Sequence, residues 1–154
     1  MFFPYTLVEY SDSPSKPKVL CPWIPIEISL DSTFASSITA LGLLDSGADF
    51  SIVDRELGEF IGIDKIERGK SIKLSGIGGG SLRGYLHEIY HRIRNPKRFR
   101  DYFVFKGVAA FTAREGFSKT DPQSTAVWGR NPVFANSYIT FSDPYEIEIG
   151  TRKN

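Results

Sequence analysis

Three short blocks of this sequence carry residue types that could do chemistry. In the first, Asp45-Ser46-Gly47-Ala48, a carboxylate, a hydroxyl and a glycine follow an apolar run that ends at Leu44. Burying an ionised carboxylate without a partner is costly, so an Asp at the end of an apolar strand needs hydrogen-bond donors around it or a second carboxylate. Gly47 permits a tight turn that brings its N–H close to Asp45. Taken alone, such a block is more often an ordinary turn than a site.

The second block, residues 76–80, has four glycines in five positions and cannot form the interior of a helix or strand. A phosphate-binding loop would need a following helix and a Lys-Ser or Lys-Thr pair, whereas Ser81-Leu82-Arg83-Gly84 follows here. The other functional interpretation is the mobile tip of a hairpin that closes over a ligand. An ordinary glycine-rich turn is the simplest alternative.

The third block is Val127-Trp128-Gly129-Arg130-Asn131, in which an arginine follows two apolar residues and a glycine. An arginine next to a core usually has a carboxylate partner, because its charge is otherwise costly to desolvate. Arg130 at the exposed start of a short helix is the alternative.

Taken together and in this order, the three blocks resemble the retropepsin-like aspartic proteases, the retroviral-protease type. Asp45-Ser46-Gly47-Ala48 matches the Asp-Thr/Ser-Gly-Ala loop of that family, Gly76-Ile77-Gly78-Gly79 is similar to its flap tip, and Trp128-Gly129-Arg130-Asn131 is similar to its Gly-Arg-Asn/Asp turn. The resemblance covers residues 22–142. Its departures are a longer segment between the flap tip and Trp128, about 20 additional N-terminal residues and a tail after Asp143.

The resemblance implies an aspartic endopeptidase with an acid-protease barrel, closed or partly open, a flap hairpin and one or two short helices. The sequence holds a single Asp-Ser/Thr-Gly loop, whereas this chemistry uses two carboxylates that share one proton. We therefore expect a homodimer with Asp45 of each chain at the two-fold axis. One Asp45 would activate water and the other, protonated, would donate to the scissile carbonyl. Ser46 and Gly47 complete the catalytic loop, and the resemblance implies that the Ser46 hydroxyls brace it across the dimer.

The expected substrate is an extended peptide or protein segment with apolar residues at the cleavage site, because several residues near the loop are apolar. Arg130 is expected to form a buried ion pair with Asp49 that holds the loop, so that losing one partner costs about 3–5 kcal/mol. No cofactor and no metal are expected. The residues expected on the substrate side are Leu43, Ala48, Asp49, Phe50, Ile77, Gly78 and Val127.

Two other functions stay open. A non-catalytic retropepsin-like module would bind a peptide or act as a dimerisation scaffold. A zinc hydrolase would use His87-Glu88-Ile89-Tyr90-His91, a literal match to His-Glu-x-x-His, which binds zinc only on a helix, and Glu115 is the one candidate for a third ligand. On a strand the two histidines would lie ~13 Å apart. The β-forming residues and Gly84 favour a strand, with the two histidines at the surface.

A basic run interleaved with aromatics lies in residues 92–102. It could contact nucleic acid, but the formal net charge of the chain is only +1, so a solvated charge cluster is favoured. We expect neither nucleic acid nor membrane as a partner.

The elements that must position these blocks are mostly short strands, which indicates a mainly β barrel or sandwich. Asp54 is expected to cap a short helix that ends near Gly62, and Asn131 a second one with Pro132 at its first position. The apolar terminal segments are expected to pair, within the protomer or across the dimer. The expected strands are 23–30, Ser37–Leu44, Ser51–Val53, 71–74, 85–93, 98–105, 138–141 and 145–149.

The chain has 154 residues, of which 41% are hydrophobic and 14% aromatic, and this excludes a disordered polypeptide. We expect a retropepsin-like domain at 22–142, an N-terminal extension or dimer strand at 1–21, and a C-terminal strand and tail at 143–154. The lone Cys21 is expected to be a small core residue. No run approaches the ~20 apolar residues that span a bilayer, and the start lacks the features of a signal peptide, so a soluble, cytoplasmic protein is expected.

Overall fold

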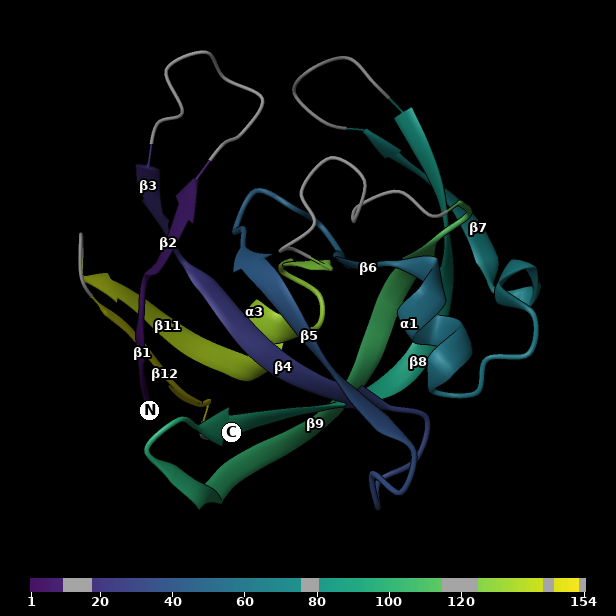
Figure 1. Cartoon of the computed structure of the whole chain (residues 1–154). Helices are drawn as coiled ribbons and strands as arrows, with labels where there is room; N and C mark the ends of the chain where they lie inside the picture. Colours follow the sequence, from purple (N-terminus) through teal and green to yellow (C-terminus); the bar gives the residue numbers. More distant parts are fainter. Residues whose placement is uncertain (10–17, 76–80, 115–124, 143–145, 153–154) are drawn as a thin grey trace.

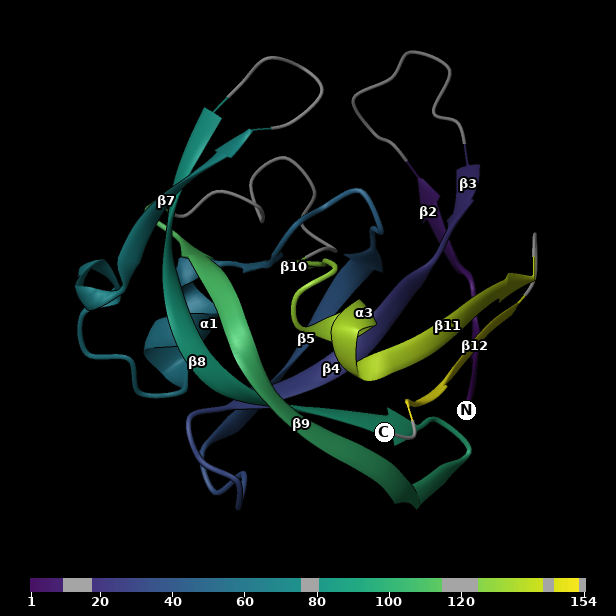
Figure 2. The same cartoon turned by 180° about the vertical axis from the view of Figure 1, so that it is seen from behind.

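The computed structural model describes residues 1–9, 18–75, 81–114, 125–142 and 146–152 (Figures 1 and 2). Its main sheet has the strand order β4-β5-β10-β6-β9-β8-β7, and β4 also pairs with β8. The sheet therefore closes into a barrel, and β7 extends beyond the closure. This confirms the mainly β fold class. The strands of this sheet are β4 (Trp23–Ser29), β5 (Ser37–Leu44), β6 (Ser51–Val53), β7 (Lys70–Ser75), β8 (Ser81–Asn95), β9 (Arg98–Thr112) and β10 (Ala126–Trp128).

Five further strands lie outside the barrel. They form a three-stranded sheet in the order β1-β12-β11 and a separate hairpin, β2–β3. The strands are β1 (Phe2–Pro4), β2 (Thr6–Glu9), β3 (Lys18–Cys21), β11 (Ser137–Ser142) and β12 (Glu146–Thr151). The helical segments of the described residues are α1 (Arg55–Phe60), the 3-10 turn η1 (Ile66–Arg68) and α3 (Val133–Asn136). Among these residues, no helix is long and apolar enough to cross a membrane.

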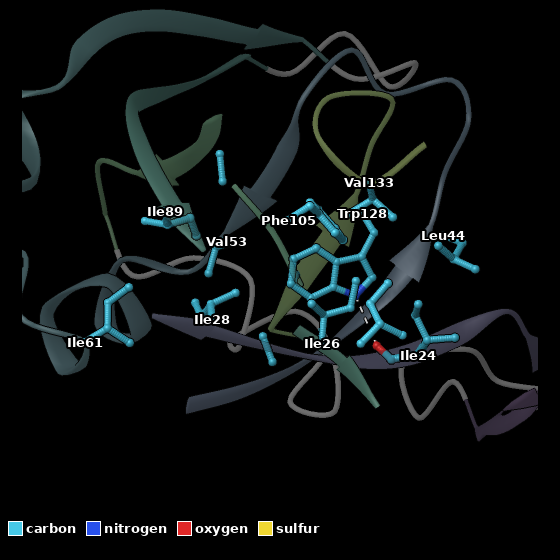
Figure 3. Close-up of a cluster of buried hydrophobic side chains, with 14 of the residues drawn as sticks. Ile24, Ile26, Ile28, Leu44, Val53, Ile61, Ile89, Phe105, Trp128 and Val133 are labelled. Atoms are coloured by element: carbon cyan, nitrogen blue, oxygen red, sulfur yellow. Dashed lines mark hydrogen bonds between the residues drawn. The ribbon is translucent and has the colours of Figure 1, made fainter. Parts of the chain in front are cut away.

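The barrel core forms where alternating residues of β4 meet the other strands. Ile24, Ile26 and Ile28 are fully buried on one face, as the alternation predicts. Figure 3 shows Trp128 among them, with its indole N–H donating to the Ile24 carbonyl at 3.1 Å. This bond satisfies a polar group that would be costly to leave unpaired inside the core. Leu30, expected on the same face, is 39% exposed, because β4 ends at Ser29.

An ion-pair network lies where β4 and β8 close the barrel. Arg92 binds Glu27 through two nitrogens, at 2.7 and 2.5 Å, and Arg94 adds a third bond at 3.1 Å. Burial alone would raise the pKa of Glu27, but hydrogen bonds from Arg92, Ser37 and Arg94 outweigh it and lower this pKa to about 2. The expectation of a solvated basic cluster is therefore wrong for Arg92, whose side chain is 13% exposed and whose charge is neutralised within the fold.

The two short helices begin close to their expected positions. Asp54 precedes α1, and Gly62 follows it with a φ of +103°, a conformation that favours glycine. The second helix starts at Val133 with Pro132 as its N-cap, so Asn131 is not the cap. The physical reason is that the Asn131 backbone is already bonded, through its N–H to the Asp49 carbonyl and through its carbonyl to the N–H of Ser51.

The terminal segments pair within one chain. β1 pairs with β12, with Phe2 opposite Glu148, and β11 pairs with the other edge of β12. The Met1 ammonium donates to the Ile149 carbonyl at 2.7 Å, which adds to this sheet. Since β12 has a neighbour on both sides, its backbone has no free edge for another strand.

Both histidines lie on β8, which is a strand over residues 81–95, so the helix that a zinc site would need is absent there. The alternation expected for a strand is confirmed, but the expected surface position is wrong for His91, and His87 is half-buried. His87 Nε2 lies 2.8 Å from the Ile66 carbonyl, whereas His91 is fully buried. The His91 ring stacks on Phe105 at 5.1 Å and meets Trp128 edge-on at 6.4 Å.

The burial of His91 predicts acid sensitivity of the fold. Burial lowers the pKa of His91 from 6.5 to about 3, so below pH 6.5 the unfolded chain binds a proton that the folded chain does not bind. The free energy of unfolding should fall by up to about 1.4 kcal/mol per pH unit between pH 6.5 and 4.5, before Glu27 begins to contribute. Urea titrations of wild type and His91→Leu measure this. The variant should lose most of that slope, and an unchanged slope would refute the assignment.

Candidate active site

Asp45 lies at the end of β5, beside the parallel strand β10. Its backbone N–H donates to the Trp128 carbonyl at 3.0 Å, which fixes its position on the barrel. Its side chain is half-buried and accepts a hydrogen bond from the Gly47 N–H at 2.8 Å, the contact expected from the sequence. The Ala48 N–H donates to the Asp45 carbonyl at 3.2 Å. A tight turn therefore presents this carboxylate at the barrel rim.

Residues 45–50, here called the Asp45 loop, are interlocked with residues 129–131, here called the Arg130 turn. Arg130 N–H donates to the Ala48 carbonyl at 2.8 Å, and Asn131 N–H donates to the Asp49 carbonyl at 3.0 Å. A bridge between Phe50 and Asn131 continues the contact. Backbone bonds thus hold the loop in place, independently of the side chains in the turn.

Residue 129 must be glycine because the Asp45 loop and the Arg130 turn pass so close to each other. A Cβ atom there would collide with the Phe50 carbonyl oxygen and lie 2.9 Å from the Ala48 carbonyl oxygen. Both obstacles are backbone atoms, which cannot rotate away as the end of a side chain could. The Gly129 N–H donates to the Ser51 hydroxyl at 3.1 Å, so a hydrogen bond also joins the Arg130 turn to the start of β6.

The expected ion pair between Arg130 and Asp49 is present within the chain. Its expected burial is wrong, because the side chains are 62% and 73% exposed. The turn places the Arg130 backbone under the loop but directs its long side chain to the surface. Solvent screens such a pair, so we expect it to add little to the stability of the protomer.

An apolar row lies beside the loop on the outer face of the barrel. Val127 of β10 is the register partner of both Leu43 on β5 and Ile52 on β6. The three side chains are half-buried, and their chain neighbours point into the core. Leu43 and Val127 were expected near the substrate, but Ile52 was missed, although the alternation in Ser51-Ile52-Val53 could have shown it.

A pocket of about 330 Å³ separates the Asp45 loop from β7. Three of the expected substrate-side residues line it, Ala48, Asp49 and Phe50, whereas Leu43 and Val127 do not. Across the pocket, β7 pairs with β8 from Lys70↔Leu86 to Ser75↔Ser81, so the strands expected on either side of the flap tip do pair, while the tip itself, residues 76–80, lies outside the described residues. The lining residues are Gly47, Ala48, Asp49, Phe50, Ile52, Ile72, Lys73, Leu74 and Ser75.

The expected contacts of Ile77 and Gly78 lie outside the described residues. In the part of the chain that the structure describes, no three His, Cys, Asp or Glu side chains come together as a metal site requires. The described chemistry of this region is two carboxylates, Asp45 and the Arg130-paired Asp49, together with the Lys73 ammonium, backbone N–H groups, an exposed Ser46 hydroxyl and apolar surface.

Comparison with known proteins adds little to the description of this chain. No family model matches the sequence, and no curated protein matches it. Among solved structures, the EIAV protease complexed with the inhibitor HBY-793 aligns with 80% of this chain and 88% of its own. The sequence identity is 16% and the TM-score is 0.40, values too low for the match to bear on activity.

The interlock predicts that a single methyl group in the Arg130 turn is more harmful than removal of the whole Arg130 side chain. Gly129→Ala should lower the free energy of unfolding by about 3 kcal/mol, because backbone must move. Arg130→Ala should lower it by less than about 1 kcal/mol, because the ion pair is exposed. Chemical denaturation of both variants measures the order. A larger loss for Arg130→Ala would show that the side chain, not the backbone, holds the loop.

Proposed function

We propose that this protein is an aspartic endopeptidase whose catalytic pair is Asp45 from each of two chains in a homodimer. One observation carries the proposal. A half-buried Asp45 carboxylate lies in a turn fixed by backbone bonds, next to an apolar row and a pocket roofed by a hairpin. A purely structural turn would not need this combination of a rigid carboxylate and adjacent open apolar surface.

The reaction needs the second Asp45 because one carboxylate cannot be both base and acid at the same moment. In the pair, like charges about 3 Å apart keep one proton between them. The ionised Asp45 takes a proton from water, whose oxygen attacks the scissile carbonyl carbon, while the protonated Asp45 donates to the carbonyl oxygen. Collapse of the tetrahedral intermediate breaks the C–N bond as a proton passes to the leaving amine. The Gly47 N–H keeps one Asp45 oxygen oriented throughout.

The substrate is an extended peptide with apolar side chains on both sides of the cleaved bond. Ile52 lines the pocket and its register partner Val127 extends the apolar surface, whereas Leu43 packs against the Val8–Cys21–Trp23 cluster. Ile72 and Leu74 of β7 line the pocket from the other side. The backbone edges of the loop and of the β7–β8 hairpin suit an extended chain, which is recognised by main-chain hydrogen bonds. Ser46, exposed at the turn, is available to bond its counterpart across the dimer.

Replacing one carboxylate oxygen of Asp45 with an amide nitrogen tests the mechanism. Asp45→Asn should reduce peptide hydrolysis about a thousandfold or more, because the amide cannot share the proton. Asp64→Asn, which alters an exposed carboxylate outside the site, serves as the matched control and should retain activity. Cleavage of a peptide library, read by mass spectrometry, measures both.

Undiminished cleavage by pure Asp45→Asn protein, folded as judged by its unfolding curve, would overturn the proposal. Wild type that binds peptides from the library and cleaves none of them would also overturn it, and would indicate the non-catalytic peptide-binding module.

A further inference from the structure

The β2–β3 hairpin begins close to the end of β5 that carries Asp45. β3 leads into β4 through Pro22, whose carbonyl accepts the N–H of Leu44 at 3.0 Å. Trp23 is opposite Leu43 in the β4–β5 register, so two residues earlier Cys21 is level with Asp45. With about 3.4 Å per residue, the rest of β3 rises past the carboxylate. Figure 1 shows this hairpin and the β7–β8 hairpin at the same end of the barrel, on either side of the β5 end.

One face of the β2–β3 hairpin is bound to its own chain and the other is open. Val8 and Cys21 are buried with Trp23, against Leu41 and Leu43 of β5. The register pairs Leu7 with Leu20 on the opposite face.

The open face carries two exposed leucines beside the exposed Lys18, and on the other face Val19 is 43% exposed. Leu7 is 57% exposed and Leu20 is 40% exposed. An exposed pair of large apolar side chains on a two-stranded ribbon is a liability in an isolated protomer, because such a ribbon has little else to stabilise it.

We propose that the β2–β3 hairpin is an arm that packs against a second copy of this chain through Leu7 and Leu20. This rests on the proposed function, because two Asp45 carboxylates that share a proton place the two-fold axis within a few ångströms of each. The β6–β7 side of Asp45 is occupied by the protein's own pocket. The side left for the second Asp45 is therefore the β4 side, where the hairpin stands. A two-fold axis brings the arm of each chain to the other, so that the contact forms twice.

The terminal sheet limits the contacts that a partner can make with β12. β12 already pairs with β1 on one edge and with β11 on the other, so it cannot add a strand from a partner. The outer edges of β1 and β11 have no neighbouring strand among the described residues, and this sheet exposes Phe2, Tyr138 and Phe141, so the arm acts beside it. The β2–β3 hairpin projects beyond the barrel rim and carries the exposed Leu7 and Leu20.

Sedimentation over a dilution series tests the arm. Wild type should dimerise, and Leu7→Lys and Leu20→Lys should each raise the dimer dissociation constant about tenfold or more. Val104→Lys is the matched control, since Val104 is also 40% exposed but lies on β9, and it should change the constant less than twofold. Hydrogen exchange of wild-type β2–β3 amides should slow as the concentration passes through the dissociation constant, which tests the contact without any substitution.

The outcomes distinguish the proposed dimer contact of the β2–β3 hairpin from the proposed catalytic function. Dimers of Leu7→Lys and Leu20→Lys as tight as wild type, with hydrolysis still lost on dilution, would overturn the arm and leave the proposed function standing. If Leu7→Lys and Leu20→Lys weaken the dimer but wild type cleaves no peptide, the arm is supported and the proposed function is overturned. A monomeric wild type with hydrolysis independent of concentration would overturn both.

Discussion

The structure depends on the backbone interlock between the Asp45 loop and the Arg130 turn. Four main-chain hydrogen bonds, from the N–H groups of Asp45, Ser51, Arg130 and Asn131, each join residues that are 80 or more positions apart in the chain. Such bonds are costly to leave unmade in a partly buried region, so they fix the loop more firmly than exposed side chains can. The interlock is possible only because residue 129 has no Cβ atom, which lets two backbones approach within contact distance.

The interlock positions the elements from which the site is assembled. It ties β5 to β10 and to β6, and this arrangement sets Leu43, Val127 and Ile52 side by side. The long β8–β9 ribbon then closes the barrel on β4, where Glu27 and Arg92 form a bidentate pair that little solvent reaches. Ion pairs thus hold the barrel closure and backbone hydrogen bonds hold the interlock, whereas the β2–β3 and β7–β8 hairpins project from the barrel rim.

The sequence allowed prediction of features that local pattern determines. Alternation predicted β4, and the turn chemistry of Gly47 predicted its bond to Asp45. The contact of Arg130 with Asp49, 81 positions apart in the chain, was expected because the Gly129-Arg130 turn was placed beneath the Asp45 loop, not from local pattern. Features set by tertiary context were missed or wrong. The three residues of β10 are too few to show a pattern, the burial of His91 depends on distant aromatics, and the exposure of Arg130 depends on where its turn directs the side chain. The pairing of β1 with β12 inside one chain was one of two outcomes that the apolar termini allowed.

The central claim is that two chains each contribute Asp45 to one catalytic pair, and subunit mixing tests it most directly. Wild type and Asp45→Asn are combined at a fixed total concentration well above the dimer dissociation constant, and peptide hydrolysis is measured against the wild-type fraction. If both carboxylates are required and the chains exchange freely, activity follows the square of that fraction, so an equal mixture retains about one quarter of the wild-type rate. Activity that is proportional to the wild-type fraction, with about one half retained, would show that a single chain holds the complete site and would contradict the account.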